Sequence, residues 1–175
     1  MMRVGIGYDS HRFASGRRLV LGGVEIPHDR GLTGHSDADV LAHALTDAIL
    51  GAAGAGDIGR LFPDTDPTHK DADSMRLLAA AHERVRAGGW TLQQADLTAI
   101  LEAPKLAPHI PAIQRRLAEV LGVAEGDISV KAKTNEGMGF TGRGEGVAAI
   151  AVATLRPVEA APLPSPAPAS TPQRA

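Results

Sequence analysis

The chain has 175 residues, 43% of them hydrophobic and only 3% aromatic, with a formal net charge of −2 and no cysteine. The length and composition indicate one domain with an aliphatic core. The absence of cysteine excludes disulfides, thiolate metal ligands and cysteine nucleophiles. The net charge gives no sign of nucleic-acid binding, and no apolar run reaches the ~20 residues of a membrane span. The N-terminus enters a strand pattern at once. We therefore expect a cytoplasmic protein without nucleic-acid or membrane partners.

The first elements expected along the chain are strands. Residues Arg3 to Phe13 predict a strand that leads into a polar segment. Residues Arg18 to Pro27 predict a second strand or a kinked hairpin, because Gly22-Gly23 interrupts an aliphatic run. A polar loop is then expected as far as His35.

A helix is predicted from Ser36 to about Ala53. The segment Ser36-Asp37-Ala38-Asp39 resembles a capping box with Ser36 at the cap. Apolar residues recur at helical spacing behind it. Asp39, His43 and Asp47 recur at intervals of four, which predicts a separate polar stripe on this helix.

The rest of the chain alternates helices and strands without a strict β-α-β repeat. This order predicts an α+β fold, with a single mixed sheet and helices packed mainly on one face. Beyond Arg156 the composition changes to Pro, Ala and Ser, so we expect a domain over residues 1–156 and a disordered tail over 157–175. The expected elements are a loop at 54–70, a helix at 74–87, a strand at 90–101, a helix at 108–121, a strand at 127–134, a glycine-rich turn at 135–146 and a strand at 147–155.

Asp9, His11 and His43 form the first candidate site. Asp9 and His11 are two residues apart on a predicted strand, so both side chains leave the same face. With His43 they could hold one divalent ion, zinc, manganese or iron, and leave a coordination position open, as catalytic metals require. The alternative is a surface Asp and His at a strand end, with His43 paired to Asp39 or Asp47.

Two further groups of residues in the N-terminal half of the chain could bind a substrate. His35 and Ser36 stand at the predicted helix start, where free N–H groups suit a phosphate, although Ser36 could simply cap the helix. The loops Asp57-Ile58-Gly59 and Phe62 to Asp66 could accept hydrogen bonds from sugar or polyol hydroxyls. Their alternative role is that of Asx-type turns.

The C-terminal half carries a third group of polar residues. Thr134 can donate to a phosphate oxygen, and Glu136 can hold a hard cation such as magnesium. The glycines that follow allow close approach of a ligand to the backbone, but a flexible hairpin would explain them equally well. Lys105 could neutralise phosphate or be an ordinary solvated lysine.

Taken together, these segments resemble the 2-C-methyl-D-erythritol 2,4-cyclodiphosphate synthase family of the non-mevalonate isoprenoid pathway. The resemblance covers roughly residues 3 to 156, in the order of the family. The matching segments are GIGYDSHRF, GGVEIP, GLTGHSDADVLAHALTDAILGAAGAGDIGRLFPDTDP, DADS, EAPKLAPHI and VKAKTNEGMGFTGRGEG.

The resemblance implies a role for each group. Asp9, His11 and His43 would hold zinc, and Glu136 a second cation, magnesium or manganese. His35 and Thr134 would stabilise the transition state. The implied substrate-binding set is Asp9, Ser10, His11, His35, Ser36, Asp57, Ile58, Gly59, Phe62, Pro63, Asp64, Thr65, Asp66, Leu101, Glu102, Ala103, Pro104, Lys105, Leu106, Ala107, Lys133, Thr134, Asn135, Glu136, Phe140 and Arg143.

The resemblance also implies a reaction and an assembly. A cytidine diphosphate substrate, 4-diphosphocytidyl-2-C-methyl-D-erythritol 2-phosphate, would be cyclised with release of CMP. The sites would lie between the subunits of a homotrimer, with Phe140 and Arg143 near a central channel where Arg143 can meet an isoprenoid diphosphate. Two alternatives remain open: a mononuclear iron oxygenase, which also suits two His and a carboxylate, and a trimeric nucleotide or isoprenoid-diphosphate sensor without turnover.

Overall fold

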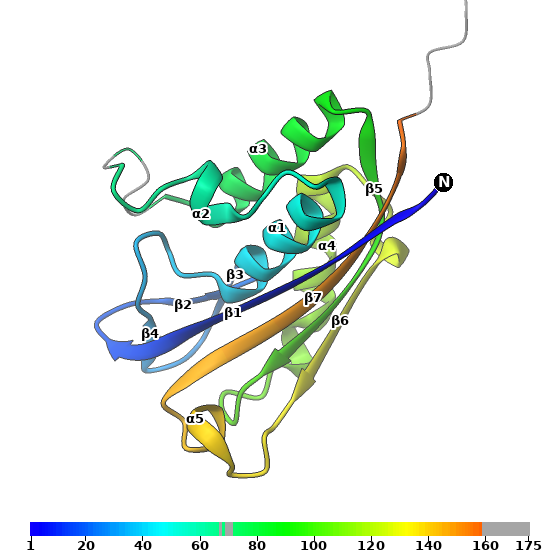
Figure 1. The fold of residues 1–175 in the computed structure, drawn as a ribbon. Helices are drawn as coiled ribbons and strands as arrows, with labels where there is room; N and C mark the ends of the chain where they lie inside the picture. The colour runs from blue at the N-terminus through cyan, green and yellow to red at the C-terminus, as the bar shows by residue number, and fades with distance from the viewer. Residues whose placement is uncertain (67, 69–71, 159–175) are drawn as a thin grey trace, which may run out of the picture.

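The structure is a computed structural model that describes residues 1–66, 68 and 72–158. Its centre is a five-stranded mixed sheet in the order β4-β1-β7-β5-β6 (Figure 1). Neighbouring strands are antiparallel except for β5 and β6, which run parallel. The α+β class with a mixed sheet is therefore confirmed. The strands are β1 (Arg3–Ser15), β4 (Arg30–Leu32), β5 (Trp90–Ile100), β6 (Ile128–Lys133) and β7 (Gly146–Pro157).

The longer helices pack on one face of this sheet (Figure 1). Alternate residues of β7 from Val147 to Leu155 are buried beneath them, whereas Ile150 and Val152 on the other face are exposed. The sheet therefore has a covered face that carries the core and an open face. The helices are α1 (Val40–Ala53), α3 (Ser74–Ala87) and α4 (Ile110–Leu121), with the short α2 (Ile58–Leu61) and α5 (Gly139–Gly142) and 3₁₀ turns at Ala107–His109 and Glu125–Asp127.

A second, two-stranded sheet stands beside the first, so the expectation of a single sheet is incomplete. It is the hairpin of β2 (Leu19–Leu21) and β3 (Val24–Ile26), which turns at Gly22-Gly23. The hairpin alternative is thus confirmed. Strand β4 was missed, because three residues are too few to show an alternating pattern in the sequence.

The close packing of α1 on β1 brings the candidate metal ligands together. A Cβ atom at Gly7 would lie 1.9 Å from the carbonyl oxygen of Ala44, and one at Gly5 would lie 2.1 Å from that of Ala48. These two glycines let the helix backbone lie directly on the strand. As a result His43 of α1 faces the side chains that leave β1 at Asp9 and His11.

The predicted start of α1 at Ser36 is wrong. The N-cap is Asp39, whose buried carboxylate accepts from the amides of Leu41 and Ala42, each at 3.1 Å. It also accepts from Gly22 N at 2.8 Å and Gly23 N at 2.6 Å, so it ties the β2–β3 turn to the helix. Asp39 therefore belongs to the core and not to a polar stripe, because a carboxylate can satisfy four donors there and a serine hydroxyl cannot.

The C-terminal boundary differs slightly from expectation. Strand β7 extends to Pro157, and the amide of Val158 donates to the carbonyl of Gly89. The tail predicted over 157–175 is therefore wrong at Pro157, which belongs to β7, and its part over 159–175 lies outside the described residues. Within the described ranges, none of the helices combines the length and the apolar character needed to cross a bilayer.

Candidate active site

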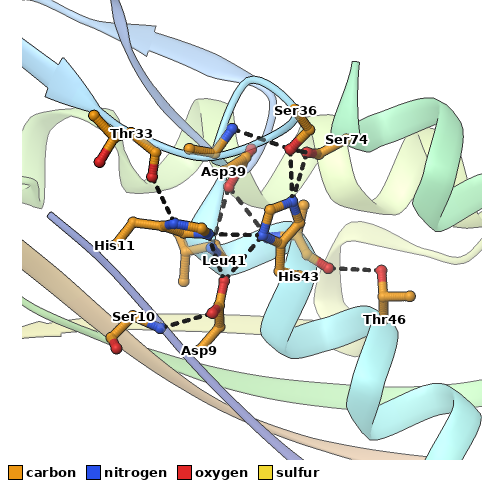
Figure 2. Close-up of polar contacts among 12 residues, drawn as sticks. Asp9, Ser10, His11, Thr33, Ser36, Asp39, Leu41, His43, Thr46 and Ser74 are labelled. Carbon is orange, nitrogen blue, oxygen red and sulfur yellow. Dashed lines mark hydrogen bonds and ion pairs between the residues drawn. The ribbon is translucent and has the colours of Figure 1, made fainter. Parts of the chain in front are cut away.

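Asp9, His11 and His43 converge as the sequence predicted (Figure 2). Asp9 Oδ2 lies 2.9 Å from His11 Nε2 and 2.9 Å from His43 Nδ1, and the two ring nitrogens are 3.0 Å apart. All the potential ligand atoms lie within 4.8 Å of one another. One ion can therefore contact all three groups, and the alternative pairing of His43 with Asp39 or Asp47 is wrong.

The outer nitrogen of His11 is anchored to the backbone. His11 Nδ1 donates to the carbonyl oxygen of Thr33 at 2.8 Å. Because a carbonyl can only accept, the neutral imidazole carries its proton on Nδ1 and directs the lone pair of Nε2 toward Asp9 and His43. Pairing of β4 with the end of β1 brings Thr33 to this place, and its own amide donates to Arg12 O at 2.9 Å.

The charges of this cluster favour a cation. Burial alone raises the pKa of the Asp9 carboxyl, but hydrogen bonds from His11 and His43 outweigh it and hold that pKa well below its usual range. Burial lowers the pKa of His11, but the hydrogen bond and charge of Asp9 outweigh this and raise it. A proton and a divalent ion thus compete for the same place. Two imidazoles and one carboxylate are a donor set typical of a catalytic zinc site with an open position.

A cavity of about 160 Å³ opens beside the cluster. Besides His11 and His43, seven residues line it; they come from α2, α3, the loop before α1 and the loop after α2, and six of the seven were expected in the substrate site. Leu77 was not, because a half-buried leucine on an amphipathic helix looks the same in a sequence as any core leucine. The lining residues are His11, His35, Ser36, His43, Ile58, Gly59, Phe62, Asp64 and Leu77.

Several other residues of the predicted acidic loops have local structural roles. Asp57 is the N-cap of α2 and accepts from Arg60 N at 2.8 Å, which is the turn role that the sequence left open. Asp66 accepts from the amide of Thr68 at 2.9 Å, and its carbonyl lies 3.4 Å from His35 Nε2. Pro63 and Thr65 are exposed and do not line the cavity.

A second cavity, of about 180 Å³, lies at the ends of β5 and β6. Leu101 and Leu106, which line it, are almost completely buried. Ala103 does not line this cavity, and Ala132, which was not predicted, does. In the described part of the chain this cavity shares no lining residue with the first. Its lining residues are Leu101, Glu102, Pro104, Lys105, Leu106, Ala107, Ala132, Lys133 and Thr134.

Glu102 holds the edge of the second cavity together. Its carboxylate accepts from the amide of Asn135 at 2.9 Å and from that of Gly137 at 3.3 Å. Within this turn Thr134 Oγ1 donates to Glu136 Oε1 at 2.5 Å. Glu136 does not belong to the metal-ligand cluster found among the described residues.

The remaining predicted residues lie near a third hollow, of about 260 Å³, around the end of β1. Ser10 and Phe140 line it with His11, Arg12 and Glu145. Arg143 does not line it, and its Nε donates to Glu145 Oε1 at 2.6 Å. Within one chain, therefore, the predicted site residues fall into separate places.

Comparison with known proteins gives a consistent assignment. A model of the YgbB family matches residues 2–156. A 2-C-methyl-D-erythritol 2,4-cyclodiphosphate synthase from Halalkalibacterium halodurans is 59% identical over 155 residues, which is 89% of this chain and 99% of that protein. The synthase of the same name from Cupriavidus necator is 60% identical over 154 residues, covering 88% of this chain and 91% of that protein.

Comparison with solved structures gives the same assignment. A structure named 2C-methyl-D-erythritol-2,4-cyclodiphosphate synthase in a CDP-bound form has a TM-score of 0.81 and 44% identity, covering 88% of this chain and all of that one. The bifunctional IspDF of Campylobacter jejuni has a TM-score of 0.88 and 46% identity over 91% of this chain, which spans only 43% of that longer protein. The chain belongs to the YgbB family, whose matched relatives carry the name 2-C-methyl-D-erythritol 2,4-cyclodiphosphate synthase.

Proposed function

We propose that this protein is a metal-dependent lyase that cyclises 4-diphosphocytidyl-2-C-methyl-D-erythritol 2-phosphate to 2-C-methyl-D-erythritol 2,4-cyclodiphosphate and releases CMP, in non-mevalonate isoprenoid synthesis. The observation that carries this proposal is the convergence of Asp9, His11 and His43 on the wall of a cavity lined by the expected substrate residues. Similarity to synthases along nearly their whole length supports the same reaction.

The reaction is an internal phosphoryl transfer. An oxygen of the 2-phosphate attacks the β-phosphorus, and the bond to the CMP oxygen breaks. The nucleophile is already an anion, so the chain need not supply a strong base. Ordering the flexible polyol for this attack can contribute ~7–11 kcal/mol to the lowering of the barrier. The cavity walls at Ile58, Gly59, Phe62 and Leu77 would impose that order.

Asp9, His11 and His43 would hold zinc in this mechanism. When bound, the ion supplies Lewis-acid polarisation of a phosphoryl oxygen. His35 stands at the exposed edge of the same cavity, where it can donate to an oxygen on which charge gathers. Thr134 would donate from the second cavity, and Glu136 would hold magnesium or manganese against the two phosphates.

The second cavity is proposed to bind the cytidine nucleotide. Backbone groups from Leu101 to Ala107 would contact the base, and Lys105 would neutralise phosphate. The ribose would lie against Asp57 and Gly59. A related structure is described as bound to CDP, which supports a nucleotide of this kind. The matched relatives named above come from bacteria, and we propose a cytoplasmic location for this chain.

We further propose that the active form is a homotrimer with each site shared between two subunits. Among the described residues of one chain the two cavities have no lining residue in common, which supports a site completed by a second copy. The open face of the sheet supports this assembly, since Ile6, Tyr8, Ile150 and Val152 are exposed on neighbouring strands, with Tyr8 opposite Ile150 and Ile6 opposite Val152. An isoprenoid diphosphate would meet Phe140 and Arg143 in the central channel.

The test is a CMP-release assay of the purified protein with and without a chelator, together with elemental analysis. We expect CMP and cyclodiphosphate in equal amounts, loss of both with the chelator, and recovery with zinc plus magnesium. Turnover that depends on oxygen and iron would favour the oxygenase alternative, so the assay is repeated under anaerobic conditions. Tight nucleotide binding without CMP release would favour the sensor.

A further inference from the structure

The outer nitrogen of His43 faces two hydroxyl groups (Figure 2). His43 Nε2 lies 2.9 Å from Ser74 Oγ and 3.0 Å from Ser36 Oγ. Ser74 is the first residue of α3 and is 1% exposed, whereas Ser36 belongs to the loop before α1. The ring of His43 is therefore held from behind by two segments that do not carry a metal ligand.

The hydrogen bonds of Ser74 decide which atom of His43 carries a proton. Ser74 Oγ–H donates to Asp37 Oδ1, and the amide of Ser74 donates to Asp37 Oδ2 at 3.1 Å. A hydroxyl has one proton to give. Since that proton is directed at the carboxylate, Ser74 Oγ can only accept from His43 Nε2–H.

Ser36 alone does not determine which nitrogen of His43 carries the proton. Its Oγ already accepts from the amide of Ala38 at 3.1 Å and lies 3.3 Å from Ser74 Oγ. No carboxylate of the described residues is hydrogen-bonded to its Oγ, so Ser36 can either donate or accept at His43. Ser74 is distinguished from Ser36 by its bond to Asp37.

We propose that Ser74 and Asp37 are positioning residues that fix the tautomer and the ring plane of His43. With the proton on Nε2, the lone pair of Nδ1 points at Asp9 Oδ2 and His11 Nε2, where the ion is proposed to bind. The opposite tautomer would place an N–H bond at that position and prevent coordination. This inference rests on the proposed function, because it assumes a metal held by Asp9, His11 and His43.

The same contacts could merely join α3 to the loop before α1, and a matched variant separates the two roles. Asp73 is the N-cap of α3 and accepts from Met75 N at 2.8 Å, next to Ser74 in the chain. No contact of Asp73 with His43 is present. Asp73→Ala therefore weakens the start of the same helix and leaves the hydroxyl behind His43 in place.

The experiment measures zinc affinity by competition with a chelator in the metal-stripped full chain. Ser74→Ala and Asp37→Ala are expected to bind zinc about 10–100-fold more weakly than the wild type, as is usual when an outer partner of a metal-binding histidine is removed. Ser74→Thr, which keeps the hydroxyl, is expected to recover most of the affinity. Asp73→Ala is expected to unfold at a lower temperature yet bind zinc like the wild type.

Proton placement is read separately by NMR of zinc-loaded protein with ¹⁵N-labelled histidine. The wild type is expected to show His43 protonated at Nε2, with a proton protected from exchange that Ser74→Ala loses. Should Ser74→Ala fail to fold, Asp37→Asn replaces it: the Asn side chain can donate to Ser74 Oγ and so release the hydroxyl proton toward His43, and a smaller loss of affinity is expected.

Two results would overturn the inference: wild-type zinc affinity in folded Ser74→Ala, or an equal loss of affinity in Asp73→Ala. The CMP-release assay keeps the proposed function separate. Wild-type protein that binds zinc through this network and releases no CMP would refute the reaction and leave the positioning role intact. Wild-type protein without measurable zinc affinity would refute both.

Discussion

The two cavities of this chain are built in opposite ways. The two histidine ligands beside the metal cavity stand on regular elements, β1 and α1, and their outer nitrogens are hydrogen-bonded to Thr33 and Ser74. The second cavity is formed mostly by the loop from Leu101 to Ala107, and a single carboxylate, Glu102, ties it to the neighbouring turn. The proposed metal ligands thus stand on a strand and a helix, whereas the proposed nucleotide site is built mostly from a loop.

This difference fits the tasks assigned to the two halves. A metal site must hold its ligands within a fraction of an ångström, which packed helices and strands achieve better than loops. A nucleotide can be bound largely through backbone groups of a loop. In the described part of one chain the two cavities are lined by different residues, which is why assembly is part of the proposal. The following predictions test that division.

The largest effect is expected from His43→Ala. It removes one of the three groups that contact the proposed ion, so zinc should be absent from the purified variant and CMP release should be lost. Nucleotide binding at the second cavity should persist, as measured by calorimetry with CDP. CMP release at a near-normal rate by the metal-free variant would contradict the mechanism.

Mixed trimers test whether the two halves come from different subunits. His43→Ala and Glu136→Ala, each with its own affinity tag, are co-expressed, and doubly tagged trimers are purified. Each variant alone should be inactive, whereas the doubly tagged trimers should show about a third of the wild-type activity, since one of the three interfaces in each mixed ring joins two intact halves. Mixed trimers that stay inactive would place both halves in one chain.

Glu102→Ala should damage the second cavity alone. The change removes the acceptor for the amides of Asn135 and Gly137, and hydrogen bonds to a charged group contribute about 1.5–3 kcal/mol. Partial exposure reduces this, so KM should rise about tenfold, with zinc content unchanged. Glu102→Gln keeps an acceptor and serves as the control. A fall in zinc content would show that the halves are not independent.

A smaller effect, on the free energy of unfolding, is expected from the titration of His82. This residue of α3 is hydrogen-bonded to Leu92 of β5. The buried Nε2 accepts from Leu92 N at 3.2 Å, and burial, helped by the charge of Arg86, lowers the pKa of His82 below its ordinary value of 6.5. Below pH 6.5 the unfolded chain takes up a proton that the folded chain resists, so the free energy of unfolding should fall as the pH decreases.

His82→Gln provides the matched comparison, because glutamine keeps an acceptor and does not titrate. Its melting temperature, followed by circular dichroism from pH 7.5 downward, should fall less steeply than that of the wild type. Parallel curves would show that His82 does not contribute to acid sensitivity.

The smallest effect is expected from deletion of residues 159–175. Both halves of the proposed site and the whole of β7 lie before this point, so CMP release and melting temperature should be unchanged. Deletion from residue 153 is the control, since it removes the buried Leu155 and should destabilise the fold. A large loss of activity in the shorter deletion would give the tail a role.

Much of the fold could be predicted from the sequence because periodicity carries it. Strands β1, β5, β6 and β7 and helices α1, α3 and α4 were expected within a few residues of their bounds. The short elements β4, α2 and α5 show no period and were missed, whereas the equally short β2 and β3 were expected as a hairpin because Gly22-Gly23 marks their turn. The helix start was misplaced because Ser36 and Asp39 are both good caps, and only the turn at Gly22-Gly23 selects the aspartate.

The sequence alone determined the types of metal ligand, the family and the chemistry that this donor set can support. Side-chain types and the spacing of motifs can be read directly from the order of residues. Only the tertiary structure decided that His43 meets Asp9 and His11 and that Ser74 stands behind it. It alone also separates Thr134 and Glu136 from the metal cluster. The physical reason is that these relations depend on how α1 packs on β1 and α3 on α1, through contacts between residues far apart in the chain.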